Sequence, residues 1–151
     1  DVKFIARRIM ILASEDIGNA DPMAMVVASA CAQEVERVGM PEAQLILAQA
    51  VTYMASAPKS NASCEAIFKA MRVVKETKTP PVPTHLQDAH YKSAEKLGHG
   101  LGYKYAHDYP NHYVKQQYLP DGLTDQVFYE PTDIGYEKQI REYFKKIKEE
   151  S

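Results

Sequence analysis

The apolar residues in the first half of the chain recur at the spacing of amphipathic helices. Ile5, Ile9 and Leu12 lie three to four residues apart, which predicts a helix over residues 2–16. Gly18 is expected to end this helix, because glycine is the residue that most often follows a helix terminus.

Three more helices are expected before residue 80. Asp21 and Pro22 form a strong start signal, since Asp caps a helix and Pro suits its first turn. The helices cover residues 23–38, 42–57 and about 60–77, the last capped by Ser60 or Asn61. Connecting loops of about two to five residues favour antiparallel neighbours. Residues 1–79 are therefore predicted to form a four-helix array of hairpins.

Two of these helices carry more apolar residues than one buried face requires. Residues 23–32 read MAMVVASACA, and residues 42–57 are alanine-rich with Leu45, Ile46, Leu47 and Val51. A helix that is apolar nearly all round is buried in a core or at an interface. We therefore expect copies of this chain to associate with one another.

The next part of the chain is predicted to be mostly irregular. Thr84 and Gln87 match a capping box, which predicts a short helix from Thr84 to about Leu97. The segment Gly98–Pro120 then holds five of the ten tyrosines, three of the five histidines and three of the seven glycines. Closely spaced glycines and an internal proline break helices, whereas disordered chains are poor in aromatic residues. We expect an ordered segment whose tyrosine rings pack on the helices.

The final helix has the clearest periodicity. Ile140, Phe144 and Ile147 lie on one face of residues 136–149, and Glu137 and Arg141 are placed on the outer face as an i,i+4 ion pair. The predicted fold is thus one all-α domain over residues 1–151. It comprises the four-helix array, a short helix and irregular segment over about 80–135, and the terminal helix.

The composition of the chain excludes some classes of protein but does not identify the function. The 151 residues suffice for one domain, and 45% hydrophobic and 25% charged residues are ordinary globular values. A net charge of −2 gives no overall attraction to nucleic acid or membrane. No apolar run approaches the ~20 residues of a membrane span. Cys31 and Cys64 lie among apolar residues, which indicates buried, reduced thiols in a cytoplasmic protein.

A cluster of carboxylates follows the first helix. Glu15 and Asp16 near a helix C-terminus oppose the helix dipole, so a partner is expected. Arg7 or Arg8, about two turns earlier, is the candidate for a structural ion pair with them. A Mg²⁺ site or a general-acid pair is the alternative.

Basic residues spread along the fourth helix and suggest an alternative role in nucleic-acid binding. Together with the Tyr-Lys-Tyr run of the irregular segment they provide stacking rings and phosphate contacts. A solvated helix face explains the same residues. The candidate DNA contacts are Lys69, Arg72, Lys75, Tyr103, Lys104 and Tyr105, with Lys59 and Lys78 at the ends of the same basic run.

His99, His107, Asp108 and His112 are the candidates for a metal site. Their spacings match no zinc motif, so hydrogen bonds to the backbone of the irregular segment are the competing explanation. The chain lacks a P-loop, and no nucleophile has an adjacent base. No catalytic, cofactor-binding or metal-binding residue is assigned.

Eight strings in fixed order carry a family resemblance. They are ARRIMILASEDIGNADP, VGMPEA, APKSN, PVPTHLQDAH, GLGYKYAHDYP, QQYLP, FYEP and GYE. The chain resembles, over essentially its whole length, the C-terminal region of the RarA/MgsA family. These are replication-associated AAA+ ATPases related to the Werner-helicase-interacting protein.

The resemblance implies a clamp-loader-like helical fold that follows the ATPase and lid domains and assembles homotetramers. It further implies a DNA-dependent ATPase that acts at stalled forks, interacts with single-strand-binding protein and associates with the bacterial nucleoid. ATP and Mg²⁺ would bind upstream, so this chain alone is expected to be no enzyme. Its first residue is Asp1 rather than Met, which fits a piece of a longer protein.

Overall fold

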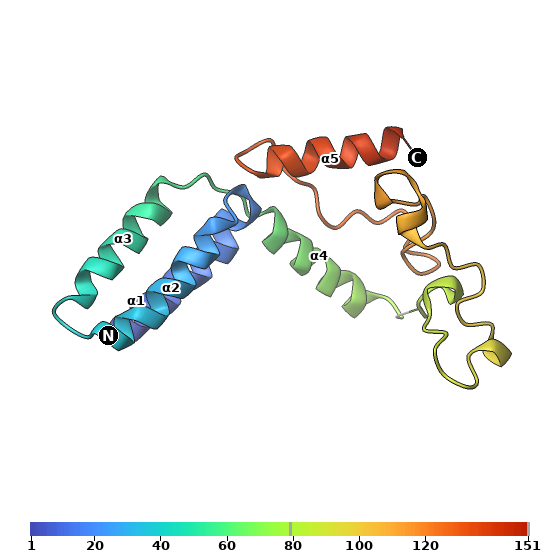
Figure 1. Ribbon diagram of the computed structural model, residues 1–151, viewed down its shortest axis with the longest axis horizontal. Coiled ribbons are helices and arrows are strands. Elements are labelled where there is room, and N and C mark those ends of the chain that lie inside the picture. The colour runs from blue at the N-terminus through green and yellow to red at the C-terminus, as the bar shows by residue number, and fades with distance from the viewer. Residues whose placement is uncertain (79, 151) are drawn as a thin grey trace. The chain divides into compact units, whose positions relative to one another are not determined.

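The computed structural model describes residues 1–78 and 80–150, and within these ranges the chain forms helices and no strand (Figure 1). The α-helices are α1 (Val2–Leu12), α2 (Met23–Val38), α3 (Ala43–Ser56), α4 (Ala62–Glu76) and α5 (Glu137–Glu149). The predicted all-α fold class is confirmed. The chain divides into unit 1, made of Asp1–Met71 and Phe128–Glu142, and unit 2, made of Arg72–Val127 and Tyr143–Ser151.

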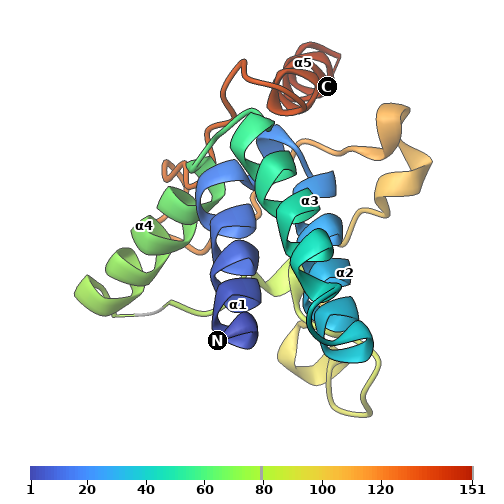
Figure 2. The same ribbon diagram turned by 90° about the vertical axis from the view of Figure 1, so that its left-hand side faces the viewer.

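Helices α1, α2 and α3 lie side by side and form the core of unit 1 (Figure 2). Small residues such as Ala24 and Ala28 are fully buried, which lets the helix backbones approach closely. Helix α4 has no buried residue. The packed array therefore contains three helices rather than the predicted four, and its predicted end at Thr79 lies outside the described residues.

Two short irregular helical turns follow the end of α1. A π-helical turn (Ala13–Ile17) and a 3₁₀ turn (Gly18–Ala20) follow α1, and Ile17 is fully buried. Gly18 has φ +51°, and a Cβ there would lie 2.8 Å from the carbonyl oxygen of Ser60. The α-helix thus ends at Leu12, earlier than predicted, and Gly18 ends the π-helical turn instead. Gly18 also permits the close approach of the segment before α4.

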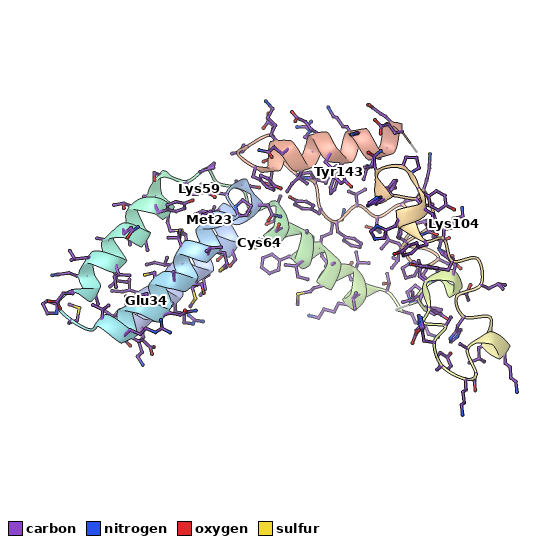
Figure 3. All side chains as sticks on the ribbon, in the orientation of Figure 1. Met23, Glu34, Lys59, Cys64, Lys104 and Tyr143 are labelled. Carbon is purple, nitrogen blue, oxygen red and sulfur yellow. The ribbon has the colours of Figure 1, made fainter. Side chains whose placement is uncertain are left out.

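Side chains satisfy the exposed ends of the helices. Asp21 Oδ1 accepts from the Met23 backbone N–H at 3.1 Å, and Ser60 Oγ accepts from that of Ala62 at 3.2 Å. Asp21 and Ser60 thus accept from backbone N–H groups at the starts of α2 and α4, although Pro22 rather than Asp21 holds the N-cap position of α2. Lys59, in the loop after α3 (Figure 3), donates to the backbone carbonyl of Met54 at 2.8 Å. This lysine belongs to the C-terminus of α3 rather than to the basic run on α4.

The predicted helix from Thr84 to about Leu97 is wrong. Two separate 3₁₀ turns, Thr84–Leu86 and Glu95–Leu97, are found instead. The Gln87 side chain donates to the Val82 carbonyl at 2.7 Å rather than closing a capping box. Asp88 Oδ1 accepts from the His90 N–H at 3.0 Å, and this local turn competes with helical bonding.

The segment Gly98–Pro120 follows a path set by local turns. Gly98 and Gly100 have φ of +71° and +74°, and their carbonyls accept from the N–H groups of Leu101 and Tyr103. Tyr103 and Tyr105 remain 60% and 54% exposed. The prediction that the tyrosine rings pack on the helices is therefore wrong for these residues, because backbone turns hold the segment without burying their rings.

Candidate functional site

Unit 1 exposes an unusual amount of apolar side chain on its packed helices. Met23 at the start of α2 (Figure 3) is 53% exposed, and Val26 is 59% exposed. On α3, Leu45 and Val51 are 68% and 48% exposed. The expected excess of apolar surface on these two helices is confirmed, and surfaces of this kind mark interaction sites.

A groove of about 410 Å³ lies between α1 and α3, within the size range of binding pockets. We call it the α1/α3 groove. Its apolar lining consists of Phe4, Ile5, Ile9, Ile11, Leu12, Val51, Met54 and Ala55. Charged residues complete the lining, namely Arg8, Glu15, Asp16 and Lys59. The groove is thus apolar along its length and charged on its rim.

Three of the four residues predicted to form a structural ion pair lie at this groove, and Arg7 does not. Arg8, Glu15 and Asp16 line it and are exposed. Within residues 1–78 and 80–150, the ion pairs join Lys3 to Glu36, Arg37 to Glu34 and His90 to Asp88. A direct contact of Arg7 or Arg8 with Glu15 or Asp16 is not among them, so that pairing stays a prediction.

The candidate DNA contacts on α4 are not equivalent. Lys69 is half-buried, and its Nζ lies 5.9 Å from the centre of the Phe128 ring as a cation–π contact. Arg72 and Lys75 are exposed and follow the apolar residues of the same helix. Lys69 therefore has a structural contact inside unit 1, whereas Arg72 and Lys75 present their charges to solvent.

The Tyr103-Lys104-Tyr105 run lies in the irregular part of unit 2, where Figure 3 labels Lys104. All three residues are exposed. The ring of Tyr105 contacts that of His107, with centroids 5.1 Å apart. The Tyr103 ring remains available for stacking on a planar ligand.

The histidines of unit 2 contact one another and the backbone. His107 Nδ1 lies 3.2 Å from His112 Nδ1, and His99 hydrogen-bonds the hydroxyl of Tyr91. His85 Nε2 lies 2.8 Å from the backbone carbonyl oxygen of Gln117. In the described part of the chain, no group of three or more His, Cys, Asp or Glu side chains is arranged to hold a metal ion.

The sequence missed the most deeply buried charged residue. Glu137, predicted on the outer face of the last helix, is fully buried at the start of α5. Its Oε2 accepts from the Tyr129 hydroxyl at 2.8 Å and its Oε1 from the Thr132 hydroxyl at 3.3 Å. The placement of Glu137 opposite Arg141 as a surface pair is therefore wrong.

This carboxyl belongs to a connected set of polar side chains in unit 1. Asn19 Nδ2 donates to the Tyr129 hydroxyl at 3.3 Å and to Ser63 Oγ at 3.1 Å. We call Asn19, Ser63, Tyr129, Thr132 and Glu137 the Glu137 network. It joins the turn after α1, the first turn of α4 and the start of α5. The strings GNADP, FYEP and GYE carry the family resemblance and contain Asn19, Tyr129 and Glu137. These strings are the sequence pattern that points to the three residues.

A backbone junction lies next to this network. The Tyr136 N–H donates to the carbonyl oxygen of Ala20 at 2.8 Å. Gly135 has φ +57°, and a Cβ at this position would lie only 2.1 Å from that same oxygen. The start of α5 is therefore locked against the turn after α1 at a point where only glycine fits.

Burial and hydrogen bonds shift the pKa values of several groups in unit 1. Burial raises the pKa of the Tyr129 phenol, the bond from Asn19 lowers it, and the bond to Glu137 raises it again. The hydrogen bond to Asp21 raises the pKa of Tyr53. Desolvation raises the pKa of Cys31 and Cys64, which favours their protonated form. These shifts describe structural residues and provide no nucleophile or base.

Both cysteines are free, with Cys31 buried and Cys64 half-buried. Within the described ranges, no helix is sufficiently long and apolar to cross a bilayer.

Comparison with known proteins identifies relatives over nearly the whole chain. The chain is 55% identical over 140 residues to an uncharacterized AAA domain-containing protein of Mycobacterium tuberculosis, covering 93% of this chain and 31% of that protein. It is 44% identical over 148 residues to replication-associated recombination protein A of Bacillus subtilis, covering 97% and 35%. It is 40% identical over 129 residues to the ATPase WRNIP1 of Dictyostelium discoideum, covering 84% and 15%.

The chain spans only about a third of the length of the two bacterial relatives. A family described as the C-terminal region of the MgsA AAA+ ATPase matches residues 1–148. Since this match covers nearly every residue, the chain belongs to the MgsA AAA+ ATPase C-terminal family.

Proposed function

We propose that this chain is the oligomerisation module of a DNA-dependent AAA+ ATPase that acts in replication, recombination and repair at stalled forks. It assembles four copies, and the ATP- and Mg²⁺-binding chemistry belongs to the part of the whole protein outside this chain. DNA and single-strand-binding protein are the proposed partners of that whole protein. The names of the relatives from Bacillus and Dictyostelium, a replication-associated recombination protein and an ATPase, support this proposal.

The observation that carries the proposal is the exposed apolar surface of unit 1. Met23, Val26, Leu45 and Val51 are each about half exposed or more, on helices whose opposite faces form the core. Burying apolar surface contributes roughly 25 cal/mol per Å², so association of copies is favourable. An exposed apolar surface of this kind is common on a subunit of an oligomer, whereas on a monomeric domain it favours aggregation.

The mass of the chain in solution tests this proposal. We expect sedimentation velocity at micromolar concentration to give a species of about four times the protomer mass of 17.0 kDa. Apolar contacts resist salt, so the species should persist in high salt. A monomer across the micromolar range would refute the proposal.

A second candidate function is DNA binding by unit 2. The exposure of Tyr103 and Tyr105 on either side of Lys104 favours it, since such rings stack on bases while the lysine contacts phosphate. Exposed Arg72 and Lys75 on α4 provide further cationic groups in the same unit.

A salt-dependent gel shift with single-stranded DNA tests this second candidate. We expect Lys104→Ala to weaken binding and to lower the slope of log K against log salt by about 0.7, the value for one phosphate contact. Lys115→Ala is the matched control, because Lys115 is an exposed lysine of the same segment next to buried Val114. Binding that is absent at low salt, or equally weakened by both variants, would contradict this role.

A further inference from the structure

We propose that the apolar face of α4 in one copy docks into the α1/α3 groove of a second copy, with its basic end against Glu15 and Asp16. This inference rests on the proposed self-association and names the surfaces that make the contact. It follows from the shape, the polarity and the direction of two surfaces in the same chain.

The groove offers an apolar floor with Glu15 and Asp16 at one end, where Lys59 also lines it but donates to the Met54 carbonyl. Phe4 and Ile5 at the start of α1 are 58% and 42% exposed, and Val51 on α3 is 48% exposed. Glu15 and Asp16 line the other end, beyond Leu12. A matching partner therefore needs an apolar stripe followed by positive charge.

Helix α4 has this pattern on one face. Ile67, Met71 and Val74 lie at positions i, i+4 and i+7 and are 55%, 61% and 58% exposed. Phe68 widens the stripe and is 53% exposed. Lys75 follows at its C-terminal end and is exposed. Such i, i+4, i+7 anchors are how amphipathic helices enter hydrophobic grooves.

The two surfaces agree in length and direction. From Ile67 to Val74 on α4, and from Ile5 to Leu12 on α1, the chain advances seven residues, about 10 Å of helix. Charged residues follow both stripes at the C-terminal side, namely Lys75 and Glu76 on α4 and Glu15 and Asp16 after α1. A second copy laid parallel to α1 thus brings Lys75 to the carboxylates of Glu15 and Asp16.

The groove is not covered by other residues of unit 1. The groove is lined by α1, the π-helical turn, α3 and Lys59, with no contribution from α4. The α4 face has no buried residue. Because the contact joins two different surfaces, it is heterologous, and each copy can give one helix and receive another. The proposed tetramer requires that four such contacts close into a ring, each turning the next copy by a quarter of a circle.

Single charge insertions test the contact. Met71→Glu damages the α4 face and Phe4→Glu damages the groove. Both positions are over half exposed, so circular dichroism should show unchanged helix content. We expect each variant to weaken association at least tenfold and to sediment as a monomer at concentrations where the parent is a tetramer. The matched control is Met40→Glu, at a residue 62% exposed between α2 and α3 and outside the groove, which should leave the tetramer intact.

Mixing the two damaged variants separates this contact from any symmetric one. Phe4→Glu retains a sound α4 face and Met71→Glu retains a sound groove, so one junction can form between them. We expect an equimolar mixture to give a heterodimer and nothing larger. In a second test, Lys75→Glu should weaken association, and Lys75→Glu combined with Asp16→Lys should restore it.

The outcomes are distinguishable. If the parent is a tetramer and Phe4→Glu or Met71→Glu remains one, the docking proposal is overturned while the proposed self-association stands. A mixture that stays monomeric, or a control variant that also dissociates, overturns the docking proposal as well. A parent that is monomeric removes both proposals together.

Discussion

Replacing Gly135 by alanine is expected to destabilise unit 1 by about 3–6 kcal/mol. A positive φ costs a non-glycine residue about 1–2 kcal/mol. The new Cβ would lie 2.1 Å from the Ala20 carbonyl oxygen, a backbone atom that cannot rotate away. The turn must separate from α5, which loses the Tyr136 N–H bond to Ala20 at about 1 kcal/mol and strains the packing by a further 1–3 kcal/mol.

The measurement is the urea midpoint followed by circular dichroism, at one fixed protein concentration because association shifts apparent stability. Gly39→Ala is the matched control. Gly39 also lies in unit 1 and has φ +75°, but a Cβ there would meet no atom within 4 Å. Gly39 has ψ 174°, in a region of the backbone map that is nearly restricted to glycine, so we expect this control to cost about 1–3 kcal/mol. Equal losses in the two variants would show that the approach of Gly135 to Ala20 contributes nothing to stability.

The regular helices were predictable because their signals are local. The spacing of Ile5, Ile9 and Leu12 predicted α1, and the Asp21-Pro22 pair predicted the start of α2. Both signals act within one or two turns of the chain, where period and capping decide the structure. Helix α5 was predicted for the same reason, from Ile140, Phe144 and Ile147.

The short helix predicted from Thr84 failed because a competing local bond was overlooked. Asp88 accepts hydrogen bonds from the backbone and from the ring of His90 at 3.0 and 2.7 Å. The same bonds lower the pKa of Asp88, since they favour its charged form. An Asp side chain that bonds two residues onward stabilises a turn against a helix, and the capping-box pattern alone does not weigh this alternative.

The role of Glu137 was not predictable from helical periodicity. An i,i+4 pair with Arg141 is the default for a polar residue on an amphipathic helix. Its partners Tyr129 and Thr132 lie outside the helix, in a segment without a regular period. Contacts of this kind depend on the path of an irregular segment. The position of the groove residues Glu15 and Asp16 is similar, because it depends on the packing of α3 against α1.

The family resemblance and the structure meet at the Glu137 network. The strings GNADP, FYEP and GYE are far apart in the chain, yet they supply Asn19, Tyr129 and Glu137 to one hydrogen-bonded set. The order of these strings in the sequence indicated the family. The hydrogen bonds among Asn19, Tyr129 and Glu137 give a physical reason why the strings are present. They hold α5 to the turn that follows α1, and this turn also ends beside the α1/α3 groove.

Removing the carboxyl group of Glu137 is the second substitution that we expect to lower the free energy of unfolding strongly. Glu137→Ala removes a fully buried carboxyl that accepts from the Tyr129 and Thr132 hydroxyls, and it opens a cavity. Hydrogen bonds to a carboxylate contribute about 1.5–3 kcal/mol, so we expect a loss of about 2–4 kcal/mol in the free energy of unfolding. Glu142→Ala, at an exposed position of the same helix, should change it by less than about 0.5 kcal/mol.

A double-mutant cycle with Tyr129→Phe separates the hydrogen bond from simple loss of volume. Tyr129→Phe keeps the ring and removes the hydroxyl that lies 2.8 Å from Glu137. If the two groups act together, the double variant should lose about 1–2 kcal/mol less than the sum of the single variants. Asn19 also loses a partner in Tyr129→Phe, so Asn19→Ala in the same background should cost less than Asn19→Ala alone. Strict additivity of Glu137→Ala and Tyr129→Phe would mean that the carboxyl stabilises α5 through its position at the helix N-terminus and independently of the network.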